Sequence, residues 1–155
     1  MTQIRKDFLN DNKHIHFIGI VGSGMFPLVQ ILHGMGYYIT GSDNNPGDTI
    51  DFEREKMDIP VVLGQKAPNI NRADLPAHTP AILDDNPEPI AATESGVPTT
   101  DRADLLGLVT TWFDHRACPC RTHPKTTTTA MLTQMFMECG LDPSADVGGK
   151  LPHIG

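Results

Sequence analysis

The chain has 155 residues, with 12 Lys and Arg against 19 Asp and Glu, which gives a formal net charge of −7 at pH 7. At about 100–200 residues per domain, this length predicts one domain and room for a fragment of a second. The charge offers no basic field for nucleic acid or an anionic membrane surface, and no apolar run approaches the ~18 residues of a membrane span. Three cysteines and a start without an apolar stretch favour a reducing, cytoplasmic compartment.

The first third of the chain predicts one βαβ unit. His14–Gly19 has the character of a short buried strand and leads into a glycine cluster, Gly19–Gly24. Tyr37–Gly41 predicts a second strand, which ends at Ser42 and Asp43. Between them, apolar residues recur at three- and four-residue steps, as in a helix with one buried face: Met25, Leu28, Val29, Leu32 and Met35.

Alternating elements continue to about residue 112. A charged helix over Asp48–Met57 and a strand over Pro60–Leu63 are followed by Ala73–Thr79, where another parallel strand is due. Pro76 argues against that strand, because proline removes a hydrogen bond from a central ladder. Helices are predicted over Asn86–Gly96 and Asp101–Trp112. The pattern favours an α/β fold with a mostly parallel sheet.

The character of the sequence changes between Trp112 and Asp114, where we place a domain boundary. Asp114–Arg121 has the length of a strand but holds Pro119. A helix then follows, ending before Gly140, with this apolar stripe: Met131, Leu132, Met135, Phe136 and Cys139. We interpret the Met131/Met135 stripe, like the Met25/Met35 stripe of the first helix, as core.

The glycine cluster is the first candidate site. Glycines between a strand and a helix let the backbone approach a pyrophosphate, and the helix start adds a positive dipole end. Asp43 ends the second strand, as does the acid that binds ribose in dinucleotide-binding folds. The usual G-x-G-x-x-G pattern would need glycine at Val21. Two interpretations of the glycine cluster therefore remain: a nucleotide site, or a tight turn that binds no ligand.

The second candidate site is Arg121–Thr127, with the sequence RTHPKTT. Lys followed by Thr at a helix start suits a P-loop, in which Lys125 neutralises phosphate charge and the Thr126 hydroxyl binds Mg²⁺. Arg121 and Pro124 occupy the positions where such a loop has glycine, and Pro124 has no N–H to donate.

Histidines and cysteines outside these two sites suggest no further chemistry. The spacing of His115, Cys118, Cys120 and His123 does not fit a zinc site. His14 and His16 share one face of their strand, and we interpret them as packing or hydrogen-bonded residues.

Taken together, these motifs resemble the Mur ligases of peptidoglycan synthesis. The likeness is carried by IHFIGIVGSGM (15–25), GYYITGSD (36–43), DLPAHTPAILDDNPEPIAA (74–92), RADLLGLV (102–109), THPKTTTTAM (122–131) and GLDPSADVGGKL (140–151). The resemblance implies a Rossmann-like UDP-binding domain over residues 1–112. It also implies that residues 113–155 are the truncated beginning of a P-loop-type α/β ATPase domain. The reaction implied is ATP-dependent amide bond formation between UDP-N-acetylmuramate and L-alanine.

The resemblance also implies roles for single residues. Gly22, Ser23, Gly24 and Asp43 would contact the UDP moiety, and His78 and Thr79 would lie near its uridine end. The ATP loop would comprise Arg121, Thr122, His123, Pro124, Lys125, Thr126 and Thr127. Lys125 would be its catalytic cation and Thr126 a ligand of Mg²⁺.

Departures from the family pattern keep other interpretations open. Val21, Arg121 and Pro124 replace glycines, Pro76, Pro89 and Pro119 interrupt apolar segments, and Asp146 stands where an aliphatic residue is due. We expect each proline in a buried strand, and an unpaired buried acid at 146, to cost a few kcal/mol. The chain alone is expected not to ligate, because the resemblance implies that it holds the first domain and only the opening of the second, and because its ATP loop is altered. A UDP-sugar-binding module without chemistry and a decayed remnant are alternatives, and a nicotinamide-dependent dehydrogenase is a third.

Overall fold

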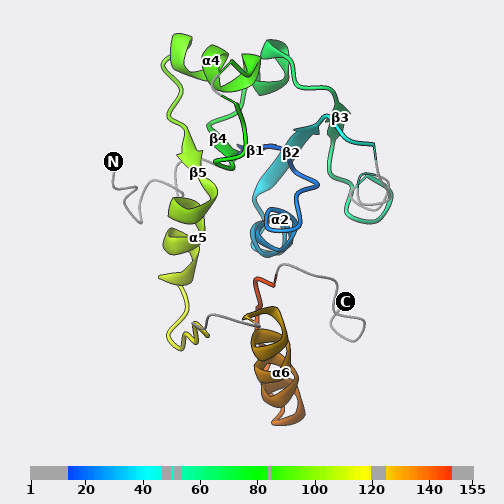
Figure 1. The fold of residues 1–155 in the computed structure, drawn as a ribbon, viewed down its shortest axis with the longest axis vertical. Helices are drawn as coiled ribbons and strands as arrows, with labels where there is room; N and C mark the ends of the chain where they lie inside the picture. Colours follow the sequence, from blue (N-terminus) through cyan, green and yellow to red (C-terminus); the bar gives the residue numbers. More distant parts are fainter. Residues whose placement is uncertain (1–13, 47–49, 51–53, 84, 120–124, 148–155) are drawn as a thin grey trace.

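The computed structural model describes residues 14–46, 50, 54–83, 85–119 and 125–147, and its centre is one parallel sheet (Figure 1). The strands are β1 (His14–Ile18), β2 (Tyr38–Asp43), β3 (Val61–Leu63), β4 (Leu75–His78) and β5 (Thr100–Asp101). The helices are α2 (Phe26–Gly34), the 3₁₀ turn η1 (Ala67–Ile70), α4 (Pro87–Glu94), α5 (Arg102–Thr110) and α6 (Lys125–Glu138). Residues 50 and 54–56 are also helical.

The strand order β3-β2-β1-β4-β5, with every pair parallel, confirms the predicted Rossmann-like sheet. From β1 the chain first builds outward through β2 and β3, and then returns to add β4 and β5 on the other side. The direction of winding thus reverses between β1 and β4. In open α/β sheets, ligands bind at the carboxyl ends of the strands at such a reversal.

The two faces of β1 carry different side chains. Ile15 and Phe17 are completely buried in the apolar core beneath α2 and α5. The two helices contribute these residues to the core: Leu28, Val29, Leu32, Leu105, Leu108 and Val109. His16 is one residue out of phase and points to the opposite face, where α4 supplies Glu88. Figure 1 shows α2 and α5 on one side of the sheet and α4 on the other. A polar pair thus lies on one face and the apolar core on the other.

β4 corrects the expectation that Pro76 would prevent a strand. Pro76 is paired with His16 in the parallel register of β1 and β4. The N–H of Asp74 donates to the His14 carbonyl at 2.9 Å, so strand alternation places the nitrogen of Pro76 at this same edge. One ladder bond is missing there, at a cost of about 0.5–1.5 kcal/mol. Burial of Leu75, Pro76 and Ala77 offsets this cost.

The other prolines also sit where the backbone tolerates them. Pro89 lies in the first turn of α4, where the N–H groups have no helical partner. Pro119 interrupts no strand, because residues 114–119 are irregular. The strand-length segment expected from Asp114 is therefore absent over its described part.

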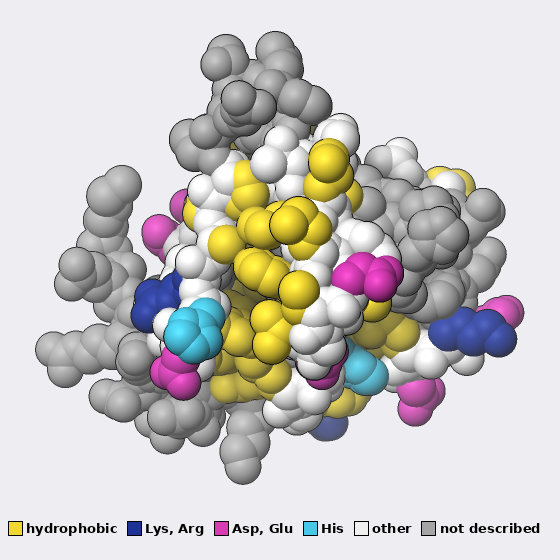
Figure 2. All heavy atoms as spheres, turned by 90° about the horizontal axis from the view of Figure 1, so that it is seen from below, with side chains coloured by type: hydrophobic (Ala, Val, Ile, Leu, Met, Phe, Trp, Pro, Cys, Tyr) yellow, Lys and Arg dark blue, Asp and Glu magenta, His cyan; other side chains and the backbone are white. Residues whose placement is uncertain are grey.

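α6 confirms the predicted helix but corrects the interpretation of its methionines. Met131 and Met135 are 63% and 62% exposed, whereas Met25 in the first helical segment is completely buried. Met35 is also partly exposed. Figure 1 shows α6 at the end of the molecule away from α4, and Figure 2, which views that end, shows hydrophobic side chains gathered in its middle. Met131 and Met135 therefore lie on the surface of the described part of the chain, whereas Leu132 and Phe136 are partly buried. In the described part of the chain, no helix is long and apolar enough to cross a membrane.

Candidate functional site

A cavity of about 600 Å³ opens at the carboxyl ends of the strands, where the winding reverses. The glycine turn after β1, the residues after β2 and β3, and the loop that leads into α4 form its walls. The lining residues are Gly19, Val21, Gly22, Asp43, Asn44, Asn45, Gln65, Ala81, Ile82, Leu83, Asp85, Asn86 and Pro87. The cavity thus lies where a parallel sheet of this topology binds its ligand.

The glycine turn is held to the sheet by one carbonyl group. The N–H groups of Gly19 and Ile20 both donate to the Ser42 carbonyl, at 2.8 and 3.1 Å. Gly19 has a φ of 79°, which favours glycine, but Val21 is not among the described residues with positive φ. Val21 therefore needs no glycine geometry, and it packs partly against the core while lining the cavity. The substitution leaves the cavity open.

Asp43, predicted to bind a ribose, lies in the wall of the cavity, and both oxygens of its carboxylate already accept hydrogen bonds. One oxygen accepts from the Val21 N–H at 3.1 Å and the other from the Asn45 N–H at 2.9 Å. The residue is 6% exposed. Each carboxylate oxygen keeps a second lone pair, so Asp43 can shape the turn and still accept from a ligand hydroxyl.

The structure brings only some of the predicted turn residues to the cavity. Gly22 lines it beside Asp43, whereas Ser23 and Gly24 lie further along the turn and outside the lining. Gly24 has another neighbour, because its carbonyl accepts from the Nε–H of Arg102 on α5. A Cβ at position 24 would lie 3.0 Å from that Nε. Glycine at 24 thus makes room for Arg102.

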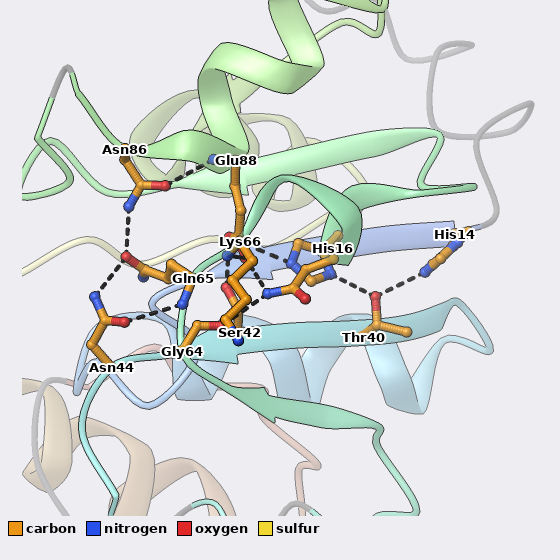
Figure 3. Close-up of polar contacts among 11 residues, drawn as sticks. His14, His16, Thr40, Ser42, Asn44, Gly64, Gln65, Lys66, Asn86 and Glu88 are labelled. Carbon is orange, nitrogen blue, oxygen red and sulfur yellow. Dashed lines mark hydrogen bonds and ion pairs between the residues drawn. The ribbon is translucent and has the colours of Figure 1, made fainter.

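Three side-chain amides in the cavity wall were missed by the sequence reasoning. The Gln65 Oε1 accepts from Asn44 Nδ2 at 2.9 Å and from Asn86 Nδ2 at 2.5 Å, and the Gln65 N–H donates to Asn44 Oδ1 (Figure 3). Asn86 also caps α4, since its Oδ1 accepts from the Glu88 N–H. The available signal was position, because Asn44 and Gln65 closely follow the strands β2 and β3.

Glu88 joins four segments beneath the cavity and is completely buried. It accepts from Ser42 Oγ at 2.6 Å, from the Lys66 N–H at 3.1 Å and from Asn69 Nδ2 at 2.6 Å. Its Oε2 lies 3.7 Å from His16 Nε2. Burial by itself would raise the pKa of the Glu88 carboxyl, but the surrounding His16, Ser42 and Asn69 outweigh burial and lower that pKa.

Comparison with known proteins decides the family. The family model described as Mur ligase family, catalytic domain, matches residues 14–113. The chain belongs to the Mur ligase family. This result confirms the resemblance drawn from the motifs and leaves the dehydrogenase alternative without support.

Individual Mur ligases are similar to nearly the whole chain. The UDP-N-acetylmuramate–L-alanine ligase of Acetivibrio thermocellus is 40% identical over 94% of this chain and 31% of its own length. The ligase of the same name from Clostridium botulinum is 41% identical over 96% of this chain and 32% of its own length. The chain thus spans about a third of the curated relatives it matches.

Solved Mur ligase structures share the fold. The UDP-N-acetylmuramate–alanine ligase of Thermotoga maritima superposes with a TM-score of 0.83 at 30% identity, over 89% of this chain and 32% of that one. A UDP-N-acetylmuramate:L-alanyl-gamma-D-glutamyl-meso-diaminopimelate ligase from Neisseria meningitides gives a TM-score of 0.79 at 26% identity. That match covers 93% of this chain and 45% of the other.

His78 and Thr79, which the Mur ligase resemblance places at the uridine end, are the last residue of β4 and the residue after it. His78 lines a second cavity of about 290 Å³, together with Ile82, Leu83, Pro89, Ile90, Thr93 and Glu94. Ile82 and Leu83 also line the first cavity, so the two are neighbours. Thr79 is outside both linings, and its hydroxyl accepts from the Ala81 N–H at 3.3 Å.

The ATP loop expected of a Mur ligase is described only from Lys125 onward. Arg121, Thr122, His123 and Pro124 lie outside the described residues, as does Cys120. α6 begins at Lys125, and Thr126 and Thr127 are exposed in its first turn. Cys118 is exposed. Within the described ranges, no three His, Cys, Asp or Glu residues are grouped as a metal site would need.

Proposed function

We propose that this chain forms the nucleotide-sugar-binding part of a UDP-N-acetylmuramate–L-alanine ligase, and that the cavity at the strand ends binds UDP-N-acetylmuramate. The carrying observation is the position of that cavity, at the winding reversal of a sheet in a Mur ligase chain. The named relatives that are 40% and 41% identical support the choice of substrate.

The chemistry of the walls suits a nucleoside diphosphate. Gly22, Ser23 and Gly24 lead into α2, whose amino-terminal end is the positive end of the helix dipole and would attract a diphosphate. Asp43 retains lone pairs for the ribose hydroxyls, as argued above. The amides of Asn44 and Asn86 add donors and acceptors to the same wall.

We assign the second cavity to the uridine end of the same ligand. Its lining is mostly apolar, with Ile82, Leu83, Pro89 and Ile90 available to pack on the faces of a base. His78 adds one polar group at its edge. A mostly apolar pocket with few placed polar groups is typical of small-molecule sites.

Residues 113–155 belong, in this proposal, to the beginning of the ATPase domain. The first turn of α6 fits this assignment, because Thr126 and Thr127 are exposed beside Lys125 at a helix start. Lys125 would neutralise phosphate charge and Thr126 would hold Mg²⁺. Bound ATP would supply the phosphoryl group that activates the substrate carboxylate for attack by the amine of L-alanine.

A UDP-sugar-binding module without chemistry is the second candidate. Arg121 and Pro124 stand in place of loop glycines, and Pro124 removes one N–H donor from any phosphate cradle. Release of ADP or phosphate by the 155-residue chain with UDP-N-acetylmuramate, L-alanine and Mg·ATP tests whether this chain has chemistry of its own. We expect release no faster than a blank without L-alanine, and clear turnover would reject the binding module.

Calorimetry tests the binding proposal directly. We expect saturable heat on titrating the chain with UDP-N-acetylmuramate, weaker binding of UMP, which lacks the second phosphate, and no binding of NADH. Asp43→Asn should weaken binding at least tenfold, whereas Asp142→Asn, an exposed acid outside both linings, should not. The absence of heat at millimolar ligand, with a folded chain by circular dichroism, would contradict the proposal.

A further inference from the structure

Two histidines and a threonine connect the surface of the molecule to the buried Glu88. His14 Nδ1 lies 2.7 Å from the Arg72 carbonyl, and His14 Nε2 lies 2.8 Å from Thr40 Oγ1. The same Thr40 hydroxyl lies 2.8 Å from His16 Nδ1, and His16 Nε2 faces Glu88 at 3.7 Å (Figure 3). All four ring nitrogens therefore face a polar partner in one continuous row.

Both ends of this row accept protons and donate none. The Arg72 carbonyl has no hydrogen, so His14 Nδ1 must carry a proton to bond with it. At the other end, an unprotonated His16 Nε2 would point its lone pair at the Glu88 carboxylate. This nitrogen is buried and has no hydrogen-bond partner among the described residues. A proton on it turns a repulsive contact into an ion pair.

The hydroxyl in the middle fixes the number of ring protons. Its two short contacts, to His14 and His16, each need one hydrogen, and Thr40 owns a single hydrogen. One of the two histidines must donate the other. Together with the protons required at the two ends, the rings hold three protons on four nitrogens. Two neutral imidazoles hold only two, so the pair carries one positive charge.

The Glu88 carboxylate is the counter-charge. It already accepts from Ser42, the Lys66 N–H and Asn69, and donors of this kind favour the ionised form. Other groups near the relay come from each neighbouring segment. Asp74 Oδ2 accepts from the backbone N–H of His14, Tyr38 packs its ring 4.7 Å from that of His14, and the register of β4 places Pro76 beside His16.

We propose that His14, Thr40 and His16 form a charge-sharing relay that holds one extra proton and neutralises Glu88. The Thr40 hydroxyl can pass its hydrogen to His14 Nε2 as it takes the hydrogen from His16 Nδ1. This double transfer moves the charge from the buried His16 to the half-buried His14, or back, without changing the proton count. His16 and Glu88 are thereby positioning residues for the cavity. Glu88 anchors Ser42, whose carbonyl holds the glycine turn, and Lys66, which follows Gln65 of the cavity wall.

Nitrogen-15 NMR of the histidine rings in the 155-residue chain tests the relay without any ligand. Spectra of His14→Gln and His16→Gln assign the two rings. At pH 7 we expect the four ring nitrogens of His14 and His16 to carry three protons in total, with one of the three shared between the two nitrogens that face Thr40. Two protonated nitrogens, with His16 Nε2 bare, would overturn the proposal.

A matched pair of variants tests the role of the bridging hydroxyl. Thr40→Val keeps the shape but removes the bridge and its two hydrogen bonds, so the count should fall to two. Thr40→Ser restores the hydroxyl and should return it to three. A count of three in Thr40→Val would show that the charge does not depend on the bridge. Glu88→Gln removes the counter-charge and should also give two; a count that stays at three would contradict the pairing with Glu88.

Discussion

Arg102 and Asp146 form an ion pair with 2.5 Å between Nη2 and Oδ2, which joins the start of α5 to the segment after α6. Arg102 also donates through Nε to the Gly24 carbonyl in the glycine turn. One guanidinium therefore links the glycine turn to the segment after α6, which we propose belongs to the second domain. Asp146 was expected to be an unpaired buried acid, and the structure corrects that expectation.

The ion pair with Arg102 only partly offsets the free-energy cost of burying the Asp146 carboxylate. Burial raises the pKa of its carboxyl, and Arg102 lowers it by less, so the pKa stays above the ordinary 3.8. At pH values between 3.8 and the raised pKa of the folded state, the folded chain therefore binds more protons at Asp146 than the unfolded chain does. Stability is therefore lost as pH rises through that window, and the loss persists at neutral pH.

We accordingly predict that Asp146→Asn does not destabilise the chain at pH 7 and raises its free energy of unfolding. The asparagine Oδ1 still accepts from Arg102, while the cost of burying a charge disappears. Urea unfolding at pH 7 and at pH 4 measures the effect, and the advantage of Asp146→Asn should shrink at the lower pH. The exposed Asp142→Asn serves as control. A destabilised Asp146→Asn at pH 7 would show that the ion pair outweighs its desolvation.

The sequence predicted the sheet well because its signals are local. The strand after residue 13, the glycine turn and the apolar face of α2 each follow from spacing within a few residues. The prediction at Pro76 was wrong because the rule against proline in a central strand counts the lost hydrogen bond. The rule leaves out the free energy gained by burying the whole strand. The amides of Asn44, Gln65 and Asn86 meet only in three dimensions, so the positions of Asn44 and Gln65 after β2 and β3 indicate an edge of the sheet but not their contact.

Contacts between distant segments also explain the error at Asp146. Arg102 and Asp146 are 44 residues apart, and neither belongs to a pattern that names the other. The periodicity of α6 identified a helix with an apolar stripe. An apolar stripe belongs to the core only where another element packs against it. Sequence periodicity identifies the stripe but does not show whether such an element exists.

Gly41 in β2 should tolerate no larger residue. A Cβ there would lie 2.4 Å from the Ile20 Cδ1 and 2.7 Å from the Ile20 Cβ, inside a packed core. We predict that Gly41→Ala lowers the free energy of unfolding by about 1–3 kcal/mol. Gly107, inside α5, has open space around it, and Gly107→Ala should raise stability by about 0.5–1 kcal/mol. Urea titrations measure the free energy of unfolding of both variants. A change of the same sign and size in Gly41→Ala and Gly107→Ala would be inconsistent with this packing.

The methionines of the two helices should respond differently to truncation. Met25 is completely buried in the core cluster, so Met25→Ala should cost about 2–5 kcal/mol. Met135 is 62% exposed on α6, and Met135→Ala should change stability by less than about 0.5 kcal/mol. Thermal unfolding of both variants at equal concentration measures the contrast. A large loss in Met135→Ala would mean that another surface covers α6 in solution.

Loss of the Glu88 carboxylate should strongly destabilise the fold. Glu88→Ala leaves Ser42, Asn69 and the histidine pair without their acceptor, at a cost of about 3–5 kcal/mol. Glu88→Gln keeps one acceptor oxygen and should cost less. Because the folded pKa of Glu88 lies below its ordinary 4.5, its ionisation stabilises the fold above that value, and the contribution is lost as pH falls through the lowered folded pKa. The difference in urea midpoint between the wild-type chain and Glu88→Gln should therefore narrow from pH 6 to pH 3.5. A constant difference over this range would show that the carboxylate charge contributes nothing to the fold.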